Sequence, residues 1–475
     1  MSDKETPDHE TPSTDSWLAS DRAVPRLVAR PFREFLDTEV AGGIALLVAA
    51  AVALIWANSP WSDSYESLLT TELSFQIGSY EIAEDLQHWV NDALMALFFF
   101  VVGLEVKREL AHGELSDPRK AAFPSVAALG GMVVPALIYT AFNLGGEGSA
   151  GWGIPMATDI AFALGVLALF GNRIHPSLKV FLLSLAVADD IGAIVVIALF
   201  YTSDLNAVAL LVAAGLLGVV ALLRALRVIW MPLYVLVGVG VWLATYESGV
   251  HATIAGVALG LMTPVNPSRD PSDDARSSLD PDPDRLDDED SQGFAPAKVR
   301  AWRLRTQERV ALGEYLEHAL HPWTSFVVVP IFALVNAGVS LTGGDISNAL
   351  SSPVTLGIVA GLVVGKLAGI SLFAYAAQRI GFAELPEGVP GRQILGAAAI
   401  AGIGFTVSLF IAELAFDEAA LIDEAKVGIL VASVLAAGLG ALVLRLGGAS
   451  GGENEGMGSA DPKIKGAAGS TGPEK

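Results

Sequence analysis

The chain has 475 residues, of which 51 are Asp or Glu and 29 are Lys or Arg, so its formal charge is −22. Hydrophobic residues make up 52% of it and charged residues only 17%, whereas soluble domains average about 25% charged residues. This hydrophobicity excludes intrinsic disorder as the overall class, and the acidic balance leaves no basic face for nucleic acid. The absence of cysteine excludes disulfides and thiolate metal sites. The composition therefore favours an integral membrane protein.

A polar N-terminal arm, residues 1–35, comes first and lacks the apolar segment of a cleavable signal peptide. Beyond it, stretches long enough to cross a hydrocarbon core of about 30 Å as helices recur up to residue 446. We therefore predict one all-α membrane domain over residues 36–446. Its predicted spans, about twelve, are Thr38–Asn58, Trp89–Leu110, Ala121–Leu144, Gly151–Phe170, Pro176–Tyr201, Leu205–Leu223, Val228–Tyr246, His251–Met262, Pro322–Leu341, Pro353–Ile380, Arg392–Ala415 and Ala425–Leu444.

Three segments of the chain are polar enough to lie outside the membrane. The loop 59–88 contains two β-like runs around Gly78, which predict a small β-hairpin over Leu73–Ile82. The segment Ser268–Asp290 holds ten acidic residues and three Arg, and we predict a disordered insertion there. It suits either a salt-rich cytoplasm or a role in collecting cations. The Gly-rich residues 447–475 predict an unstructured tail.

The cations sort to one side of the predicted membrane. The N-terminal arm, alternate loops and the C-terminus hold 27 of the 29 Lys and Arg, and the opposite loops hold none. The positive-inside rule then places both termini in the cytoplasm, as an even number of spans requires. Two lysines escape the sorting: Lys426, expected to extend to the outer surface, and Lys366, in the middle of a span.

Four ionisable residues fall near the middle of predicted spans: Asp159, Asp189, Asp190 and Lys366. Each costs about 2.5–3.5 kcal/mol on membrane-insertion scales, so such residues usually line a water path or pair with one another. A buried salt bridge that fixes helix packing is one interpretation. One lysine cannot neutralise three carboxylates, however, so part of the cluster must bind protons or a cation.

Two of the spans near these residues contain helix-breaking residues. Gly151–Pro155 and Thr158 precede Asp159, and Gly402-Ile-Gly404 precedes Thr406. Pro and Gly leave backbone groups free to face a cavity, and interrupted segments in both halves indicate the site of an inverted-repeat transporter. If the breaks cross, Asp159 would offset the N-terminal half-helix ends and Lys366 the C-terminal ends. The alternative is a pair of packing kinks.

A second polar group lies at the cytoplasmic ends of the second and ninth spans. These residues are either interfacial anchors or a charged funnel that attracts cations and titrates near neutrality. His318 and His321 could also hold a metal, although a helix start at a wet interface explains them better. Gly361, Gly365 and Gly369 form a small-residue face that would let a neighbouring helix approach Lys366. The members of the polar group are Glu105, Lys107, Arg108, Glu109, Glu317, His318 and His321.

These features occur within strings that resemble the NhaA family of bacterial sodium/proton antiporters over about residues 36–446. The strings include VGLEVKREL from Val102, ATDIAFALGVLAL from Ala157, DDIGAIVVIALFYT from Asp189, EHALHPW from Glu317 and GIGFTVSLFIA from Gly402. The resemblance implies twelve helices with an inverted repeat, in which the fourth and eleventh helices are unwound and cross.

The resemblance also implies roles for individual residues. Asp190 matches the principal ion- and proton-binding carboxylate, with Asp189 beside it as a possible partner of Lys366. Thr158, Asp159 and Pro155 match the break of the fourth helix, and Gly404 matches that of the eleventh. The hairpin Leu73–Ile82 resembles a dimer contact. The residues implied in the pH response are Glu105, Arg108, Glu109, His251, Glu317, His318 and His321. The acidic insertion, the acidic arm and Glu413 depart from the family.

From the residues and the resemblance we expect a transporter, not an enzyme, in the inner membrane of a prokaryote. It would exchange cytoplasmic Na⁺ or Li⁺ for external H⁺ by alternating access. The ion- and proton-binding residues would be Asp190, Asp189, Asp159 and Thr158, with Na⁺ held at Asp189 and Asp190. Desolvation favours the protonated form of a buried carboxyl group, so protons and Na⁺ can compete for one site. No cofactor is expected. The alternatives are a sodium-coupled symporter of organic anions and an intramembrane aspartyl protease.

Overall fold

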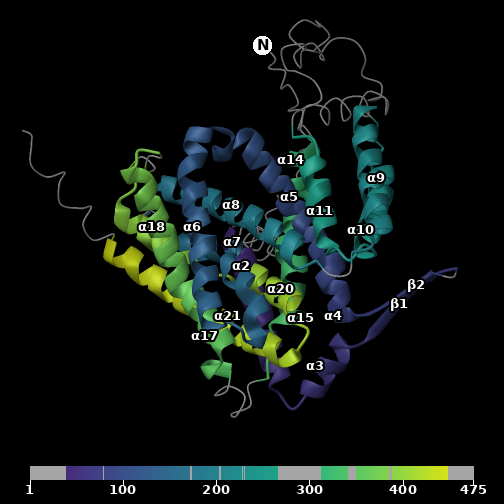
Figure 1. The fold of residues 1–475 in the computed structure, drawn as a ribbon, viewed down its shortest axis with the longest axis horizontal. Helices are drawn as coiled ribbons and strands as arrows, with labels where there is room; N and C mark the ends of the chain where they lie inside the picture. The colour runs from purple at the N-terminus through teal and green to yellow at the C-terminus, as the bar shows by residue number, and fades with distance from the viewer. Residues whose placement is uncertain are drawn as a thin grey trace, which may run out of the picture.

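The computed structural model describes residues 39–78, 80–171, 174–202, 205–226, 228, 230–265, 312–340, 349–382, 385 and 388–447. The predicted arm, the acidic insertion and the tail beyond residue 447 lie outside the described residues. Within these, the chain is helical with one small sheet (Figure 1). Its elements are α2 (Glu39–Ala57), α3 (Ser62–Leu69), β1 (Glu72–Ile77), β2 (Tyr80–Asp85), α4 (Leu86–Trp89), η3 (Val90–Leu94), α5 (Met95–His112), η4 (Glu114–Ser116), α6 (Pro118–Phe142), η5 (Glu147–Met156), α7 (Ile160–Ala168), α8 (Pro176–Phe200), α9 (Ala207–Ala225), α10 (Met231–Tyr246), α11 (Thr253–Met262), α14 (Leu312–Trp323), η8 (Thr324–Val328), α15 (Val329–Asn336), α17 (Pro353–Val359), η9 (Ala360–Gly365), α18 (Lys366–Arg379), α19 (Gly391–Ile400), α20 (Phe405–Ala415) and α21 (Ala419–Gly447).

Among the described residues, seven helices are long and apolar enough to cross a membrane, and three bent helix pairs could each form one more span. The chain is therefore a multi-pass membrane protein with seven to ten spans by length and composition. Two shorter apolar helices, α10 and α11, accompany them. The long helices are Leu86–His112, Pro118–Phe142, Pro176–Phe200, Ala207–Ala225, Leu312–Asn336, Pro353–Arg379 and Ala419–Leu446.

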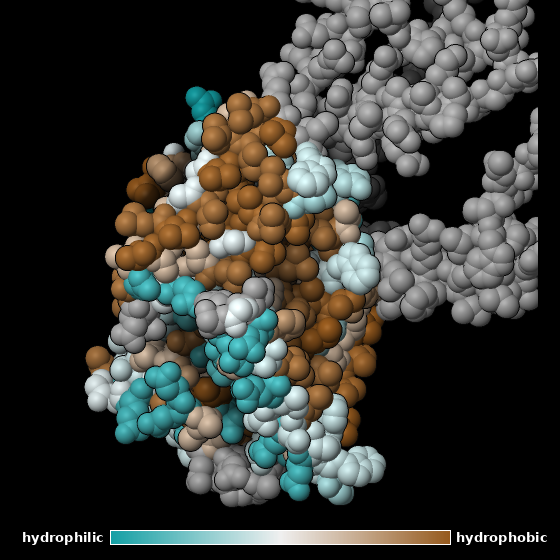
Figure 2. Space-filling view, turned by 90° about the vertical axis from the view of Figure 1, so that its right-hand side faces the viewer, coloured by the Kyte–Doolittle hydropathy of each residue, from teal (hydrophilic) through white to brown (hydrophobic). Residues whose placement is uncertain are grey.

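The outer surface of the helices is itself apolar. On α9, Val208 and Leu211 are 71% and 73% exposed, and Leu236 on the neighbouring α10 is 69% exposed. Figure 2 shows hydrophobic residues covering most of one face, with hydrophilic residues gathered toward one end. An apolar surface of this extent marks contact with a membrane.

The predicted β-hairpin is confirmed. β1 and β2 pair antiparallel, with Leu73 opposite Glu84 and Gln76 opposite Glu81. Gly78 at the turn has a φ of 67°, a left-handed conformation that glycine adopts without strain. The hairpin projects away from the helical body (Figure 1). Its base is fastened by Tyr246, whose hydroxyl donates a hydrogen bond to Glu84, and by Trp89, whose indole N–H donates to the Leu73 carbonyl at 3.0 Å.

Small residues let α6 approach the helix that carries Lys366, as the sequence predicted. A Cβ atom added to Gly369 would lie 2.1 Å from the carbonyl oxygen of Gly130, so the two backbones are in direct contact. A Cβ on Gly365 would lie 2.8 Å from the Cα of Pro135. The preceding turn, η9, is π-helical, a form that occurs often at functional sites. This packing fixes Lys366 in the middle of the bundle.

Candidate functional site

Two spans are interrupted where the sequence places glycine and proline. The 3₁₀-helix η5 ends at Met156 and α7 begins at Ile160, with a bend of 47° between them. The helices α19 and α20 are likewise bent by 43°, and Gly404 is the N-cap residue of α20. Pro155 lies in η5 and packs against Gly361, where an added Cβ would lie 2.8 Å from the Cβ of Pro155. Backbone amides and carbonyls at both breaks are left without helical partners.

The two breaks are hydrogen-bonded to each other. The backbone N–H of Asp159 donates to the carbonyl of Ile403 at 2.7 Å. From the other break, the hydroxyl and the backbone N–H of Thr406 donate to Asp159 Oδ2 at 2.7 and 3.1 Å. The hydroxyl of Ser408 donates to the Ile154 carbonyl at 2.7 Å. Segments about 250 residues apart in sequence are thus joined at the level of Asp159.

The carboxylate of Asp159 lies at the N-termini of two half-helices. Its Oδ1 caps α7 by accepting the N–H of Phe162 at 3.0 Å, and its Oδ2 accepts from Thr406 at the start of α20. A negative charge at these positions offsets the partial positive charges of both helix ends. Asp159 is only 3% exposed, so water contributes little to this balance.

Asp189 and Lys366 form a fully buried ion pair. Lys366 Nζ donates to Asp189 Oδ2 at 2.5 Å, and both side chains are 0% exposed. Asp189 is the partner that the resemblance implies for Lys366, and the expectation that Lys366 also offsets C-terminal helix ends stays a prediction. The hydroxyl oxygen of Thr158 lies 2.8 Å from both Asp189 Oδ2 and the Ala401 carbonyl. Its single hydrogen can go to only one of them at a time.

Two sets of carboxylate oxygens at this site have no hydrogen-bond donor among the described residues. Asp189 Oδ1 is buried and without a partner. Asp190, 7% exposed, has no donor within the described part of the chain either. Buried polar atoms are almost always satisfied, so unpartnered acceptors beside an ion pair need a reason. A proton or a small hard cation would supply what they lack.

At one end of α5 the structure brings together part of the predicted cytoplasmic group. Arg108 pairs with the buried Glu317 at 2.5 Å, while the second carboxylate oxygen of Glu317 has no partner. Glu109 is buried and accepts from the backbone N–H of Glu114 at 2.9 Å and from the Ser184 hydroxyl at 3.4 Å. Glu105 lies one turn earlier on α5.

His318 and His321 are exposed residues of α14, and His318 lies beside Glu317 and interacts with it electrostatically. No group of three or more His, Asp or Glu among the described residues could hold a metal ion. His251 lies in the turn between α10 and α11, where its Nε2 is 2.5 Å from the Tyr201 carbonyl at the end of α8. Burial lowers the pKa of His251.

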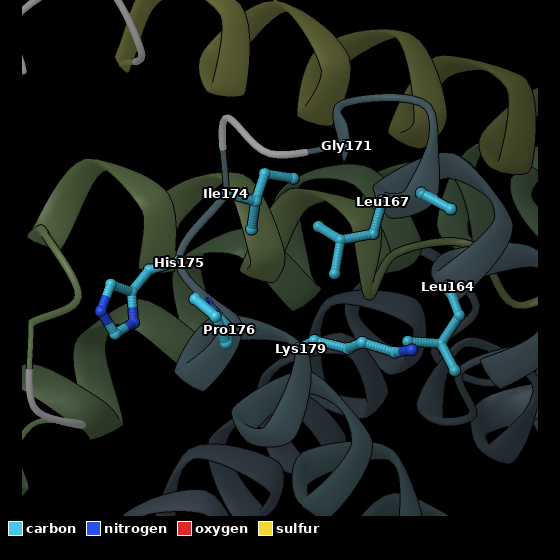
Figure 3. A pocket seen from close by; sticks show the side chains of 8 residues that line it. Leu164, Leu167, Gly171, Ile174, His175, Pro176 and Lys179 are labelled. Atoms are coloured by element: carbon cyan, nitrogen blue, oxygen red, sulfur yellow. The ribbon is translucent and has the colours of Figure 1, made fainter.

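A cavity of about 430 Å³ lies elsewhere, between the end of α7 and the start of α8 (Figure 3). Leucine, isoleucine and proline side chains line most of it, with His175 and Lys179 at its polar edge. Its lining contains none of the predicted ion-binding residues. The unpartnered carboxylate oxygens therefore do not line this cavity.

Comparison with known proteins identifies the family. The model of the family described as Na⁺/H⁺ antiporter 1 matches residues 33–444. The chain belongs to this family. It is 48% identical to the Na(+)/H(+) antiporter NhaA 3 of Frankia alni over 88% of this chain and 89% of that protein. The Na(+)/H(+) antiporter NhaA of Rhodopirellula baltica is 47% identical, covering 88% and 94%. NhaA 1 of Klebsiella pneumoniae is 46% identical, covering 88% and 97%.

Several contacts of this antiporter-family chain were not predicted from its sequence. Lys426, expected to extend to the outer surface, is only 6% exposed and lies 2.7 Å from Glu413, so that expectation is wrong. The contact of Thr406 with Asp159 was not predicted, although Thr406 follows the glycine break that marks its span. No local sequence pattern predicts the contact of Ser184 with Glu109, since the two residues lie on different helices.

Proposed function

We propose that the chain exchanges cytoplasmic Na⁺ or Li⁺ for external H⁺ at one site formed by Asp189, Asp190 and Thr158. The observation that supports this best is the set of acceptor oxygens on Asp189 and Asp190 that lack donors among the described residues. Carboxylate, hydroxyl and carbonyl oxygens are the hard ligands that suit a small alkali cation. The family offers no support for an organic-anion symporter, the alternative that the sequence left open.

In the proposed cycle, protons and Na⁺ compete for the same carboxylates. With Na⁺ absent, Lys366 neutralises Asp189, and Asp190 carries the exchanged proton. When Na⁺ arrives, it replaces the proton on Asp190 and is also coordinated by Asp189 Oδ1. The Thr158 hydroxyl then donates to the Ala401 carbonyl, which turns its oxygen toward the cation. Each half of the cycle thus keeps the buried charge balanced without both ions being bound together.

The same proposal extends to the architecture. Counting the seven long helices, the three bent pairs and the two shorter apolar helices each as one span makes twelve spans, which the proposal relates by an inverted repeat with crossing breaks. An even number and the one-sided distribution of Lys and Arg place both termini in the cytoplasm. A fluorescent protein fused to the C-terminus should fluoresce, because it does so only in the cytoplasm. An alkaline phosphatase fused at the same place is active only outside the cytoplasm, so activity of that fusion would contradict this topology.

Two further roles belong to the proposal. The ion pair of Arg108 and Glu317, with Glu105, Glu109, His318 and His321 nearby in sequence, would make exchange depend on cytoplasmic pH. His251 would contribute by joining the end of α8 to α11. The hairpin Leu73–Ile82 would pair with a second copy, since each strand of a two-stranded sheet has a free edge and Phe75 on it is 62% exposed.

Reconstituted protein tests the central proposal. In proteoliposomes with a pH-sensitive dye, Na⁺ or Li⁺ should move protons and K⁺ should not. Asp190→Asn removes the exchanging charge at nearly constant volume, so exchange should disappear while the protein keeps its elution profile and melting temperature. Glu66→Gln makes the same loss of charge at an exposed position of α3 and should exchange normally. Exchange by Asp190→Asn at a rate near the parent's would show that the site is assigned wrongly.

A further inference from the structure

A second buried ion pair lies outside the ion site. Glu413 near the end of α20 and Lys426 in α21 are 2.7 Å apart, and their side chains are only 11% and 7% exposed. Burying two charges costs several kcal/mol each, and only mutual pairing with good contacts offsets that cost. The proposed exchange chemistry uses neither residue. Their burial therefore needs another explanation.

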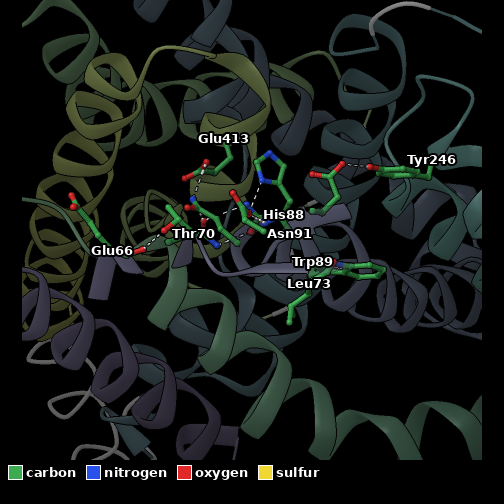
Figure 4. A network of polar contacts seen from close by, with 12 residues as sticks. Glu66, Thr70, Leu73, His88, Trp89, Asn91, Tyr246 and Glu413 are labelled. Atoms are coloured by element: carbon green, nitrogen blue, oxygen red, sulfur yellow. Dashed lines mark hydrogen bonds and ion pairs between the residues drawn. The ribbon is translucent and has the colours of Figure 1, made fainter. Parts of the chain in front are cut away.

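The pair belongs to a layer of polar side chains contributed by five elements, α4, η3, α15, α20 and α21. The amide of Gln87 in α4 donates to Glu413 Oε2 at 3.4 Å and to Asn336 Oδ1 at 3.2 Å. Asn336 in α15, 0% exposed, donates in turn to Asn91 Oδ1 at 2.7 Å. Figure 4 shows Glu413 and Asn91 within this group. We call Gln87, Asn91, Asn336, Glu413 and Lys426 the polar layer.

An aromatic layer lies next to it, formed by α5, α15 and α20. The ring of Phe410 in α20 is 5.2 Å from that of Phe99 in α5 and 6.3 Å from that of Phe332 in α15. All three rings are at most 3% exposed. Phe410 precedes Glu413 by three residues and Phe332 precedes Asn336 by four, so each pair shares one face of its helix.

Both layers lie along α20 between the level of Asp159 and the end of the molecule that carries the hairpin. Along α20, Thr406 bonds to Asp159, Phe410 follows one turn later, and Glu413 lies about 10 Å beyond Thr406. Gln87 is the second residue after β2, at the hairpin end. An ion that followed α20 from the ion site to this end would pass the level of the aromatic rings and then that of the polar layer.

We propose that these layers form the outer gate of the ion path and that the pair of Glu413 and Lys426 locks it. The proposal rests on alternating access and names two residues that control access and not ion binding. The closed gate keeps both charges paired in the protein. When the gate opens, water reaches both charged side chains, so neither charge is left buried without a partner. The pair can therefore separate at a modest cost in free energy. Loss of either charge would remove the attraction that favours closure.

Cysteine labelling tests the lock, and the chain contains no native cysteine to interfere. Ala333 is 0% exposed and lies between Phe332 and Asn336, so Ala333→Cys reports on the closed path. A membrane-impermeant thiosulfonate reagent is added to the outside of oriented proteoliposomes. We expect slow labelling of the single variant and labelling faster by about tenfold or more once Glu413→Gln or Lys426→Met is added.

Two control variants keep the result specific. Glu66→Gln removes an exposed negative charge on the hairpin side and should leave the labelling rate unchanged. The exchanged pair Glu413→Lys with Lys426→Glu should restore slow labelling, because the attraction is restored with reversed polarity. Glu413→Gln should also lower the apparent KM for external Na⁺ and raise that for internal Na⁺, since it favours the outward-open state.

The outcomes separate a gate from a structural contact. A lower melting temperature of Glu413→Gln with unchanged labelling would mean that the pair only stabilises the fold, and the proposal would fall. Faster labelling in the Glu66→Gln control to the same extent would also overturn it. Labelling does not depend on exchange, so an inactive parent protein with a lock that responds as expected would refute the proposed exchange function and leave the gate standing.

Discussion

Removal of Lys366 should destabilise this protein more than removal of a lysine from a solvent-exposed ion pair. Lys366 and Asp189 are both 0% exposed at 2.5 Å, whereas Lys120 and Glu114 are 62% and 42% exposed at 3.6 Å. Breaking a buried pair from one side costs about 3–5 kcal/mol. An exposed pair contributes about 0–1 kcal/mol. We therefore expect Lys366→Ala to lower the melting temperature in detergent several times more than Lys120→Ala.

The same pair of variants should respond differently to acid. In Lys366→Ala, the uncompensated charge is the Asp189 carboxylate, so protonation at low pH should recover part of the lost stability. Lys120→Ala leaves an exposed carboxylate that water already solvates and should show no such recovery. Lys366→Arg keeps a positive charge at this position and should retain some transport. Equal melting temperatures of the two alanine variants at neutral pH would refute a structural role for the buried pair.

Three further predictions concern neighbouring parts of the molecule. Asp159→Asn should slow exchange less than Asp190→Asn in the proteoliposome assay, because its carboxylate is satisfied by two helix ends. Thr406→Val removes a hydroxyl that is hydrogen-bonded to that carboxylate, so it should cost about 1.5–3 kcal/mol of folding free energy and lower the melting temperature. Thr406→Ser keeps the hydroxyl and should melt close to the parent. A neutral Gly/Ser linker in place of Ser268–Asp290 should weaken apparent Na⁺ affinity at low salt only, if that segment collects cations.

The parts of the fold that could be predicted depend on local sequence patterns. Apolar stretches of about 20 residues indicate membrane helices wherever they occur. Residues Leu73–Ile82 predict a hairpin because two β-like runs flank a glycine that can take a positive φ. Asp189, Asp190 and Lys366 stood out because ionisable groups are costly inside a membrane. Each of these inferences needs only residues that are close in sequence.

The contacts that were missed depend on how distant segments meet. Asp159 and Thr406 are 247 residues apart, and no local pattern shows that the two helix breaks share hydrogen bonds. Lys426 resembles an interfacial lysine until α20 and α21 are placed side by side. The π-helical turn η9 before Lys366 is another example, since its composition of Gly, Ala, Leu and Val fits an α-helix equally well.

The distribution of hydrogen-bond donors assigns separate tasks to the three buried aspartates. Asp159 receives donors from α7 and α20 and therefore stabilises the joined breaks. Asp189 is held by Lys366 and shares a hydroxyl hydrogen with the Ala401 carbonyl, so its environment can change when a cation arrives. Asp190 has no donor in the described part of the chain, so its charge depends most on what it binds. With one fixed, one adjustable and one open carboxylate, the proposed exchange would leave the joint between the two helix breaks undisturbed.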